Sequence, residues 1–95
     1  MSADPRIPTP HAFVRLQEDP VRGGWALQAP ERVLTLDEIA HAIVSRCDGA
    51  ASVDEIVASL AAEYDAPAGE IRTDVLATLN MLVSRDFLSF RDGAA

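Results

Sequence analysis

The residues that could carry chemistry in this chain are few and widely separated. Cys47 is the single cysteine, and neither His11 nor His41 is visibly placed to act as its base. A cysteine nucleophile needs a group that favours the thiolate, and a multi-cysteine zinc site needs further thiols. We therefore interpret Cys47 as a buried structural thiol, with no disulfide inside the chain.

Two adjacent carboxylate pairs, Asp37-Glu38 and Asp54-Glu55, are the other candidates for chemistry. Acid–base catalysis would need such groups in a buried cleft with shifted pKa values. Both pairs instead fall in the first turn of a predicted helix, where negative charge favours the helix dipole. The sequence contains no glycine-rich phosphate loop, paired-histidine metal motif or nucleophile elbow. It therefore predicts a protein that is not an enzyme and has no metal or other cofactor.

The size and charge of the chain limit its partners. Its 95 residues suit one small domain, and its formal net charge is -7 with no lysine. Residues 1–35 are formally neutral, so the excess of acids lies in the helical remainder. This remainder repels phosphate, which predicts no nucleic-acid partner and favours a basic peptide or protein surface. No apolar run approaches the roughly 18 residues of a membrane span and no secretory signal is evident, so we expect a cytoplasmic protein with no membrane partner.

The first part of the chain predicts a three-stranded antiparallel meander. Ala12–Gln17 alternates between apolar and other side chains, and Trp25–Ala29 has apolar residues at every second position. The turns are marked by glycine and proline, and we expect type I geometry around Pro30. Arg32–Thr35 would form a short third strand, with a free edge that could hold another chain.

Two helices are predicted from helix-capping signals and from apolar residues at helical spacing. Thr35–Glu38 and Ser52–Glu55 both have the spacing of a capping box. The first helix should therefore begin near Leu36 and end at Asp48-Gly49. The second should begin directly after Ser52.

The third predicted helix runs from about Pro67 to Arg85 and has a wide apolar arc. The arc covers roughly 160°, whereas one packed face needs roughly 100°. Either this central helix contacts both other helices and the sheet, or part of its arc lines a groove for a partner. Phe87–Phe90 would then form a short strand or close the core. The apolar arc consists of Ile71, Val75, Leu76, Leu79, Leu82, Val83 and Phe87.

These elements together predict an α+β fold that resembles a winged helix-turn-helix, with a three-stranded antiparallel β-meander followed by three α-helices. We expect a flexible N-terminal arm over residues 1–11, one domain over residues 12–90 and a C-terminal tail over residues 91–95. A winged-helix DNA reader would present basic groups on its third helix, but that face offers Glu70, Asp74 and Asn80. This face argues that the fold serves a purpose other than reading DNA, and a domain that holds another chain is the first hypothesis. The alternatives are a winged-helix DNA-binding regulator and a structural dimerisation module.

Four short sequence elements occur in an order that is typical of one family. They are Asp19-Pro20-Val21-Arg22-Gly23, Ala29-Pro30-Glu31-Arg32-Val33, Cys47-Asp48-Gly49 and Asp74-Val75-Leu76. Across residues 13–88 the chain closely resembles the PqqD family, small proteins of pyrroloquinoline quinone (PQQ) biosynthesis. One departure is Asp86, where related sequences often end the third helix on glycine. The resemblance implies a peptide chaperone, or precursor-peptide recognition element, that binds the precursor peptide PqqA and presents it to the radical S-adenosylmethionine enzyme PqqE.

The resemblance also implies where the peptide would bind. In similar domains the peptide adds as a strand to the third β-strand and packs against the third helix. At the matching positions the edge would be Arg32, Val33, Leu34 and Thr35. The helix wall would come from among Val75, Leu76, Leu79 and Leu82. An alternative for Arg32 is that its charge protects an edge strand against aggregation. The sequence leaves the oligomeric state open between a monomer and a homodimer.

Overall fold

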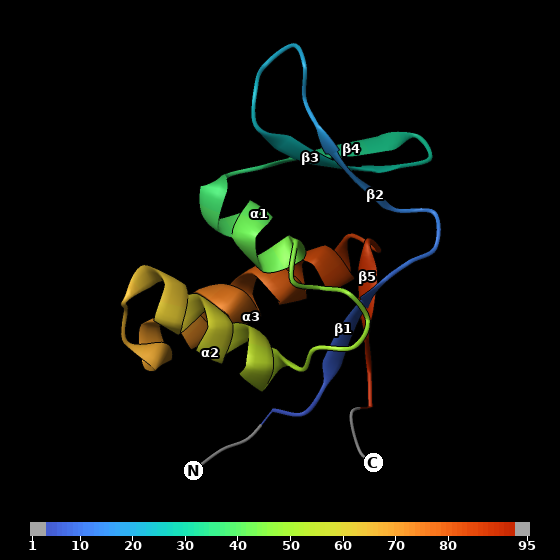
Figure 1. Ribbon diagram of the computed structural model, residues 1–95. Coiled ribbons are helices and arrows are strands. Elements are labelled where there is room, and N and C mark those ends of the chain that lie inside the picture. The colour runs from blue at the N-terminus through green and yellow to red at the C-terminus, as the bar shows by residue number, and fades with distance from the viewer. Residues whose placement is uncertain (1–3, 93–95) are drawn as a thin grey trace.

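The computed structural model describes residues 4–92 and places a three-stranded sheet above three helices (Figure 1). The outermost parts of the predicted arm and tail, residues 1–3 and 93–95, lie outside this range. The strands β2, β3 and β4 form an antiparallel meander, which is followed by the three helices and confirms the predicted winged-helix-like α+β fold. In chain order the elements are β1 (Ile7–Pro10), β2 (Arg15–Glu18), β3 (Trp25–Ala29), β4 (Arg32–Leu36), α1 (Glu38–Val44), α2 (Val53–Tyr64), α3 (Ala68–Ser84) and β5 (Leu88–Arg91).

A second, two-stranded sheet joins the two ends of the described chain. β1 pairs antiparallel with β5, with Ile7 opposite Arg91 and Pro10 opposite Leu88. The prediction of a flexible arm is therefore wrong for residues 7–10, and Arg91 belongs to a strand rather than to a tail. Proline lacks a backbone N–H and normally argues against a strand, so the two prolines of β1 hid it from sequence reasoning.

One face of the meander packs on the helices. Leu16, Leu27 and Leu34 lie directly opposite one another on neighbouring strands, and all three belong to or pack against the hydrophobic core. At the edge of this face, the Trp25 ring stacks on His41 of α1 with the ring centroids 4.4 Å apart. The sheet is thus fixed to the helices by apolar and aromatic contacts.

The β3–β4 turn differs in type from the one that the sequence predicts. Glu31 has a φ of 65°, and a positive φ at the third position of a tight turn is the mark of type II rather than type I. Proline at the second position suits both types, so Pro30 alone could not distinguish them.

Helix α1 begins two residues later than predicted, and the capping box at Thr35–Glu38 is absent. The carboxylate of Asp37 caps the helix by accepting a hydrogen bond from the Ala40 N–H at 2.7 Å. Leu36 still belongs to β4, where it pairs with Trp25. The strand ladder therefore continues through the position at which local sequence signals placed the helix start.

The second predicted capping box is present. The Ser52 hydroxyl accepts from the Glu55 backbone N–H at 3.1 Å, and the Glu55 carboxylate accepts from the Ser52 N–H at 2.9 Å. Helix α2 begins directly after this cap, as predicted. Helix α1, in contrast, ends at Val44, well before Asp48-Gly49, and the Asp48 carboxylate orders the following loop by accepting two backbone N–H groups.

Helix α3 ends without the glycine that is common in related sequences. Asp86 itself adopts the left-handed conformation, with a φ of 65°. Its N–H donates to the Val83 carbonyl at 3.0 Å, and the Phe87 N–H donates to the Leu82 carbonyl at 2.9 Å. These two bonds satisfy carbonyl groups at the helix end. Aspartate therefore performs the role of glycine here.

Cys47 is a buried structural thiol, as predicted. Its Sγ donates to the Ile43 carbonyl at 3.3 Å, and burial raises the pKa of the thiol to about 12. At neutral pH the group is therefore protonated and a poor nucleophile.

No helix within residues 4–92 is long and apolar enough to cross a membrane.

Candidate functional site

β4 forms a free edge of the meander, because within the described chain it pairs with β3 alone. Ala29 and Arg32 close the tight turn and face each other across the ladder. Opposed antiparallel residues alternate between hydrogen-bonded and non-bonded pairs, and a tight turn closes on a bonded pair. The backbone groups of Arg32 and Leu34 therefore point toward β3, whereas those of Val33 and Thr35 point outward. Two residues of β4 thus offer backbone donors and acceptors to an incoming strand.

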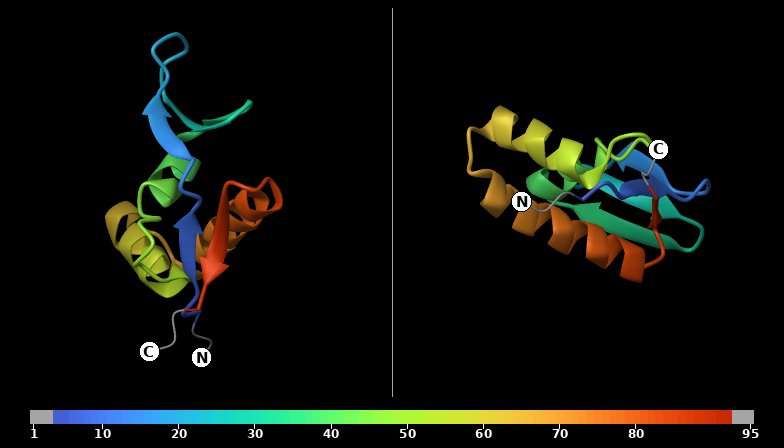
Figure 2. Two further views of the ribbon diagram at one scale, coloured as in Figure 1. Left: turned by 90° about the vertical axis from the view of Figure 1, so that its right-hand side faces the viewer. Right: turned by 90° about the horizontal axis from the view of Figure 1, so that it is seen from below.

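Two surface cavities, which we call the β4–α3 groove, lie between this edge and α3, one at each end of β4. Figure 2 shows α3 below the sheet on the side of β4. The cavity at the start of β4 measures about 440 Å³ and is lined by Glu31, Arg32, Val33, Leu34, Arg85 and Phe87. The cavity at the end of β4 measures about 370 Å³ and is lined by Thr35, Leu36, Asp37, Ile39, Ala40, Asp74, Ala77, Thr78 and Met81.

The four predicted edge residues all line the groove, but the four predicted helix residues do not. Val75, Leu79 and Leu82 are 0% exposed and belong to the hydrophobic core. Leu76 is half-buried, and at 100° per residue it lies about 140° around the helix from Met81. The wide apolar arc therefore serves mainly to pack α3 on its neighbours, which is the first of the two readings that the sequence left open.

The groove residues of α3 form a separate, mostly polar face. At 100° per residue they cover an arc of about 100° beside the buried stripe. A sequence signal for this face exists, because the residues recur at helical spacing along one flank of the apolar arc. Sequence reasoning missed them because it followed the apolar arc, and most of these residues are small or polar. The residues are Asp74, Ala77, Thr78, Met81 and Arg85.

Arg32 is held in a defined position at the start of the groove. Its guanidinium donates to the Arg85 carbonyl, and its central carbon lies 5.0 Å from the centroid of the Phe87 ring. The side chain thus joins β4 to the end of α3. A guanidinium has five N–H donors, so several stay available to a ligand.

Comparison with known proteins places this chain in a family. A family model described as "Coenzyme PQQ synthesis protein D (PqqD)" matches residues 24–88, which is more than half of the chain. This chain belongs to the PqqD family. A relative from Xanthomonas campestris pv. campestris (strain 8004), named PqqA binding protein, is 52% identical over 69 residues, or 73% of this chain and 75% of the relative. A relative of the same name from Xanthomonas axonopodis pv. citri (strain 306) is 44% identical over 81 residues, or 85% and 88% of the two chains.

Two solved PqqD structures are similar to this fold. The first is the solution structure of the PqqD part of Methylobacterium extorquens PqqCD, described as a functional, stand-alone recognition element for ribosomally synthesised and modified peptides. It is 36% identical, with a TM-score of 0.77 over 87% of this chain and 88% of that chain. The second is the crystal structure of PqqD from Xanthomonas campestris, which is 47% identical with a TM-score of 0.60 over 83% and 88%. Both likenesses confirm the PqqD fold.

The perturbed carboxyl groups of this PqqD-family chain lie away from the groove. The hydrogen bond from Arg72, at 2.7 Å, lowers the pKa of Asp54, and the backbone N–H of Asp4 lowers it further. The hydrogen bond from Arg6 similarly lowers the pKa of Asp4. These contacts attach the N-terminal segment to α2 and join α2 to α3. Lowered pKa values keep carboxylates ionised, which suits structural ion pairs.

No cluster of metal ligands is found in the part of the PqqD-family chain that the structure describes. Within residues 4–92, no three histidine, cysteine, aspartate or glutamate side chains gather in a way that could hold a metal ion. The carboxylate pairs that sequence reasoning considered include the N-cap Asp37 and the Arg72 partner Asp54. Both are already bound to structural partners.

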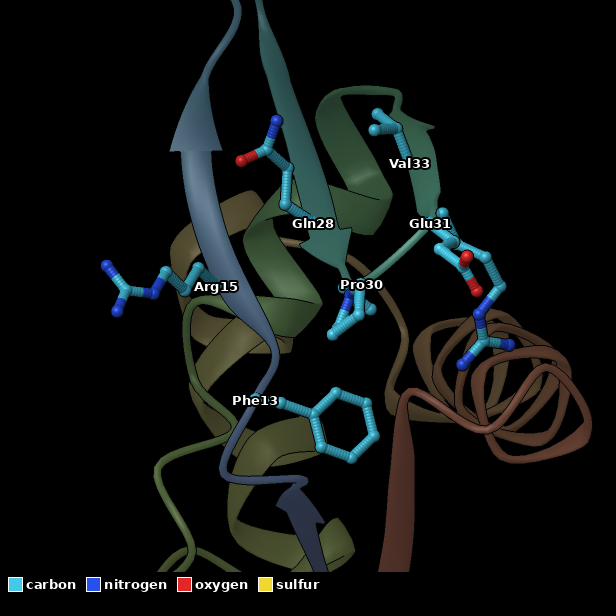
Figure 3. A pocket seen from close by; sticks show the side chains of 8 residues that line it. Phe13, Arg15, Gln28, Pro30, Glu31 and Val33 are labelled. Carbon is cyan, nitrogen blue, oxygen red and sulfur yellow. The ribbon is translucent and has the colours of Figure 1, made fainter.

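A further hollow lies at the β3–β4 turn on the opposite side of the sheet from the helices. It measures about 430 Å³. Arg15, Gln28 and Val33, which line it, oppose one another on neighbouring strands. Figure 3 shows Phe13 below Pro30, and Arg15 directed away from both. The hollow meets the groove at β4, because Val33 lines both.

Proposed function

We propose that this protein binds the precursor peptide PqqA as an added strand on β4, in the β4–α3 groove, and presents it to the radical enzyme PqqE. The observation that carries the proposal is the outward-facing backbone of Val33 and Thr35 beside two cavities, in a member of the PqqD family. Strand addition of this kind combines backbone hydrogen bonds with pockets for alternate side chains. The names of the relatives support PqqA as the ligand.

The chemistry of the groove suits an extended peptide. Val33 is 63% exposed at the unpaired edge, and its side chain lies on the face of the sheet away from the helices. On the helix side of this edge, Met81 and Ala77 offer apolar surface between polar neighbours. A peptide strand paired with β4 would therefore direct alternate side chains to α3 and the others to the side of Val33.

Energetic considerations predict moderate affinity. Ordering each peptide residue costs about 1–2 kcal/mol, and a net backbone hydrogen bond contributes about 0.5–1.5 kcal/mol. These two terms nearly cancel, so strand pairing alone adds little to the binding free energy. Two or three apolar side chains buried at about 1.5–3 kcal/mol each would supply the surplus. After association costs, binding should lie in roughly the micromolar range.

The proposal is tested by an amide chemical-shift titration of the ¹⁵N-labelled protein with the PqqA peptide of Xanthomonas campestris. We expect the largest shifts at Val33, Thr35, Ala77 and Met81, with small shifts along β2. Binding whose shifts avoid both β4 and the groove side of α3 would contradict strand addition in this groove. An absence of shifts at saturating peptide would contradict PqqA binding itself.

The PqqD resemblance implies that PqqE crosslinks a glutamate and a tyrosine of PqqA, so presentation is tested separately by following this crosslinking with and without this protein. We expect crosslinked peptide only when all three components are present, and no product from this protein with PqqA alone. Equal product without this protein would contradict the presenting role while leaving peptide binding intact.

A duplex DNA control should show no binding, because the helical half is acidic.

A further inference from the structure

The two ends of the β4–α3 groove carry opposite charge. Arg32 and Arg85 line the cavity at the start of β4, together with a single acid, Glu31. Asp37 and Asp74 line the cavity at the end of β4, and no basic residue lines it. The groove therefore has a cationic end and an anionic end.

The charges differ in how far they are already satisfied within the protein. The Arg32 guanidinium is held by the Arg85 carbonyl and the Phe87 ring, and within residues 4–92 it forms no ion pair with a carboxylate. Asp74 is exposed and forms none of the ion pairs found among residues 4–92. Asp37 uses one carboxylate oxygen for the Ala40 N–H. Both ends therefore keep charge available for a ligand.

The spacing of the two ends is set by the walls of the groove. Four residue steps along β4, from Arg32 to Leu36, span about 13 Å at 3.3 Å per step. Eleven steps along α3, from Asp74 to Arg85, span about 16 Å at 1.5 Å per step. The strand and the helix thus separate the two charges by similar lengths. In an extended peptide this length corresponds to roughly four or five residues.

We propose that the groove selects a peptide segment with a carboxylate and a cation about four or five residues apart, the carboxylate toward Arg32 and Arg85 and the cation toward Asp74 and Asp37. The cation is a lysine, an arginine or the peptide's own amino terminus. This inference rests on the proposed function and adds the register of the bound peptide. If the strand adds antiparallel to β4, the cation precedes the carboxylate in the peptide sequence.

Double-mutant cycles between protein and peptide test this register. The protein variants are Arg85→Gln and Asp74→Asn; each charged residue of the Xanthomonas campestris PqqA peptide is replaced in turn by a neutral one, and its amino terminus is acetylated. Affinity is measured by fluorescence anisotropy at low and at high salt. We expect each protein variant to weaken binding about twofold to fivefold at low salt, with smaller losses at high salt. Arg85→Gln should couple to one acidic peptide residue, and Asp74→Asn to one basic group about four or five residues away.

The matched controls are Arg22→Gln in the β2–β3 turn and Glu18→Gln at the end of β2, both exposed and outside the groove. They make the same changes of net charge and should leave affinity nearly unchanged. Losses equal to those of the groove variants would show an effect of net charge alone and overturn the proposal. Absence of coupling in a peptide that binds normally would overturn it too, while leaving the proposed function standing.

A charge exchange distinguishes pairing from fold damage. Asp74→Lys should weaken binding of native PqqA, and replacing the coupled basic peptide residue by glutamate should restore most of the loss. Failure of this rescue in a variant with the native melting temperature would contradict the assigned register. If wild-type protein binds no PqqA at all, both this inference and the proposed function fail.

Discussion

The two faces of α3 show how one helix can serve both stability and recognition. The face of Val75, Leu79 and Leu82 has no exposed surface, and it packs on the other helices and the sheet. The neighbouring face, with Ala77 and Met81 among its residues, lines the groove beside β4. Branched apolar side chains are therefore used for the core, and the proposed binding wall consists of Met81, Ala77 and polar side chains. An apolar arc by itself is thus a poor guide to a binding surface.

The sharpest test of this difference is Leu79→Ala. Removing a fully buried leucine should destabilise the protein by about 2–5 kcal/mol, through lost burial and the cavity left behind. Chemical denaturation measures this effect. Peptide affinity of the folded fraction should stay close to wild type. A loss of affinity well beyond the unfolded fraction would show that the buried face contributes to the groove after all.

Val33→Pro should have the largest effect on binding. It removes an outward-facing backbone donor and places a ring against the incoming strand, so affinity should fall by about tenfold or more. Stability should change little, because proline is tolerated on the open side of an edge strand. Val33→Ala is the matched control, since it shortens the side chain and keeps the N–H. Equal losses in the two variants would indicate that the side chain, rather than the donor, carries the interaction.

Met81→Ala should have a moderate effect confined to the groove face. Met81 is half-buried and lines the cavity at the end of β4, so shortening it should weaken peptide binding by about 1 kcal/mol through lost apolar contact. Leu76→Ala, on the far flank of the same helix, serves as the comparison. It should affect stability more than affinity. The reverse result, measured by anisotropy and thermal unfolding, would mean that the proposed binding face of α3 is misplaced.

The smallest expected effect is a pH dependence that arises on the structural side of α3. Arg72 lowers the pKa of Asp54 in the folded protein, so the ion pair contributes stability above the unfolded pKa of about 4 and loses it as pH falls through the folded pKa. The unfolding temperature should therefore fall more for wild type than for Asp54→Asn as the pH is lowered from about 5 to about 3. Identical declines would show that this contact does not contribute to stability.

Local signals predicted those elements whose ends are set by neighbouring residues. The capping box at Ser52 fixed the start of α2, because its two hydrogen bonds lie within four residues of chain. The same pattern at Thr35–Glu38 failed, because β4 extends to Leu36 through its pairing with Trp25. β1 was missed because its two prolines argue against a strand and because its pairing is distant in the sequence. Its partner β5 lies at the other end of the chain, and no local pattern records a pairing over that separation.

For the candidate site, the sequence identified the edge and the structure decided the wall. Alternation and turn residues were sufficient to place Arg32–Thr35 in a strand, and the family resemblance assigned that strand to a peptide. Helical periodicity showed which residues of α3 share a face, but it cannot show how the helix is rotated against the sheet. That rotation is set by tertiary packing, which draws Val75, Leu79 and Leu82 out of water and leaves Met81 and its polar neighbours beside β4.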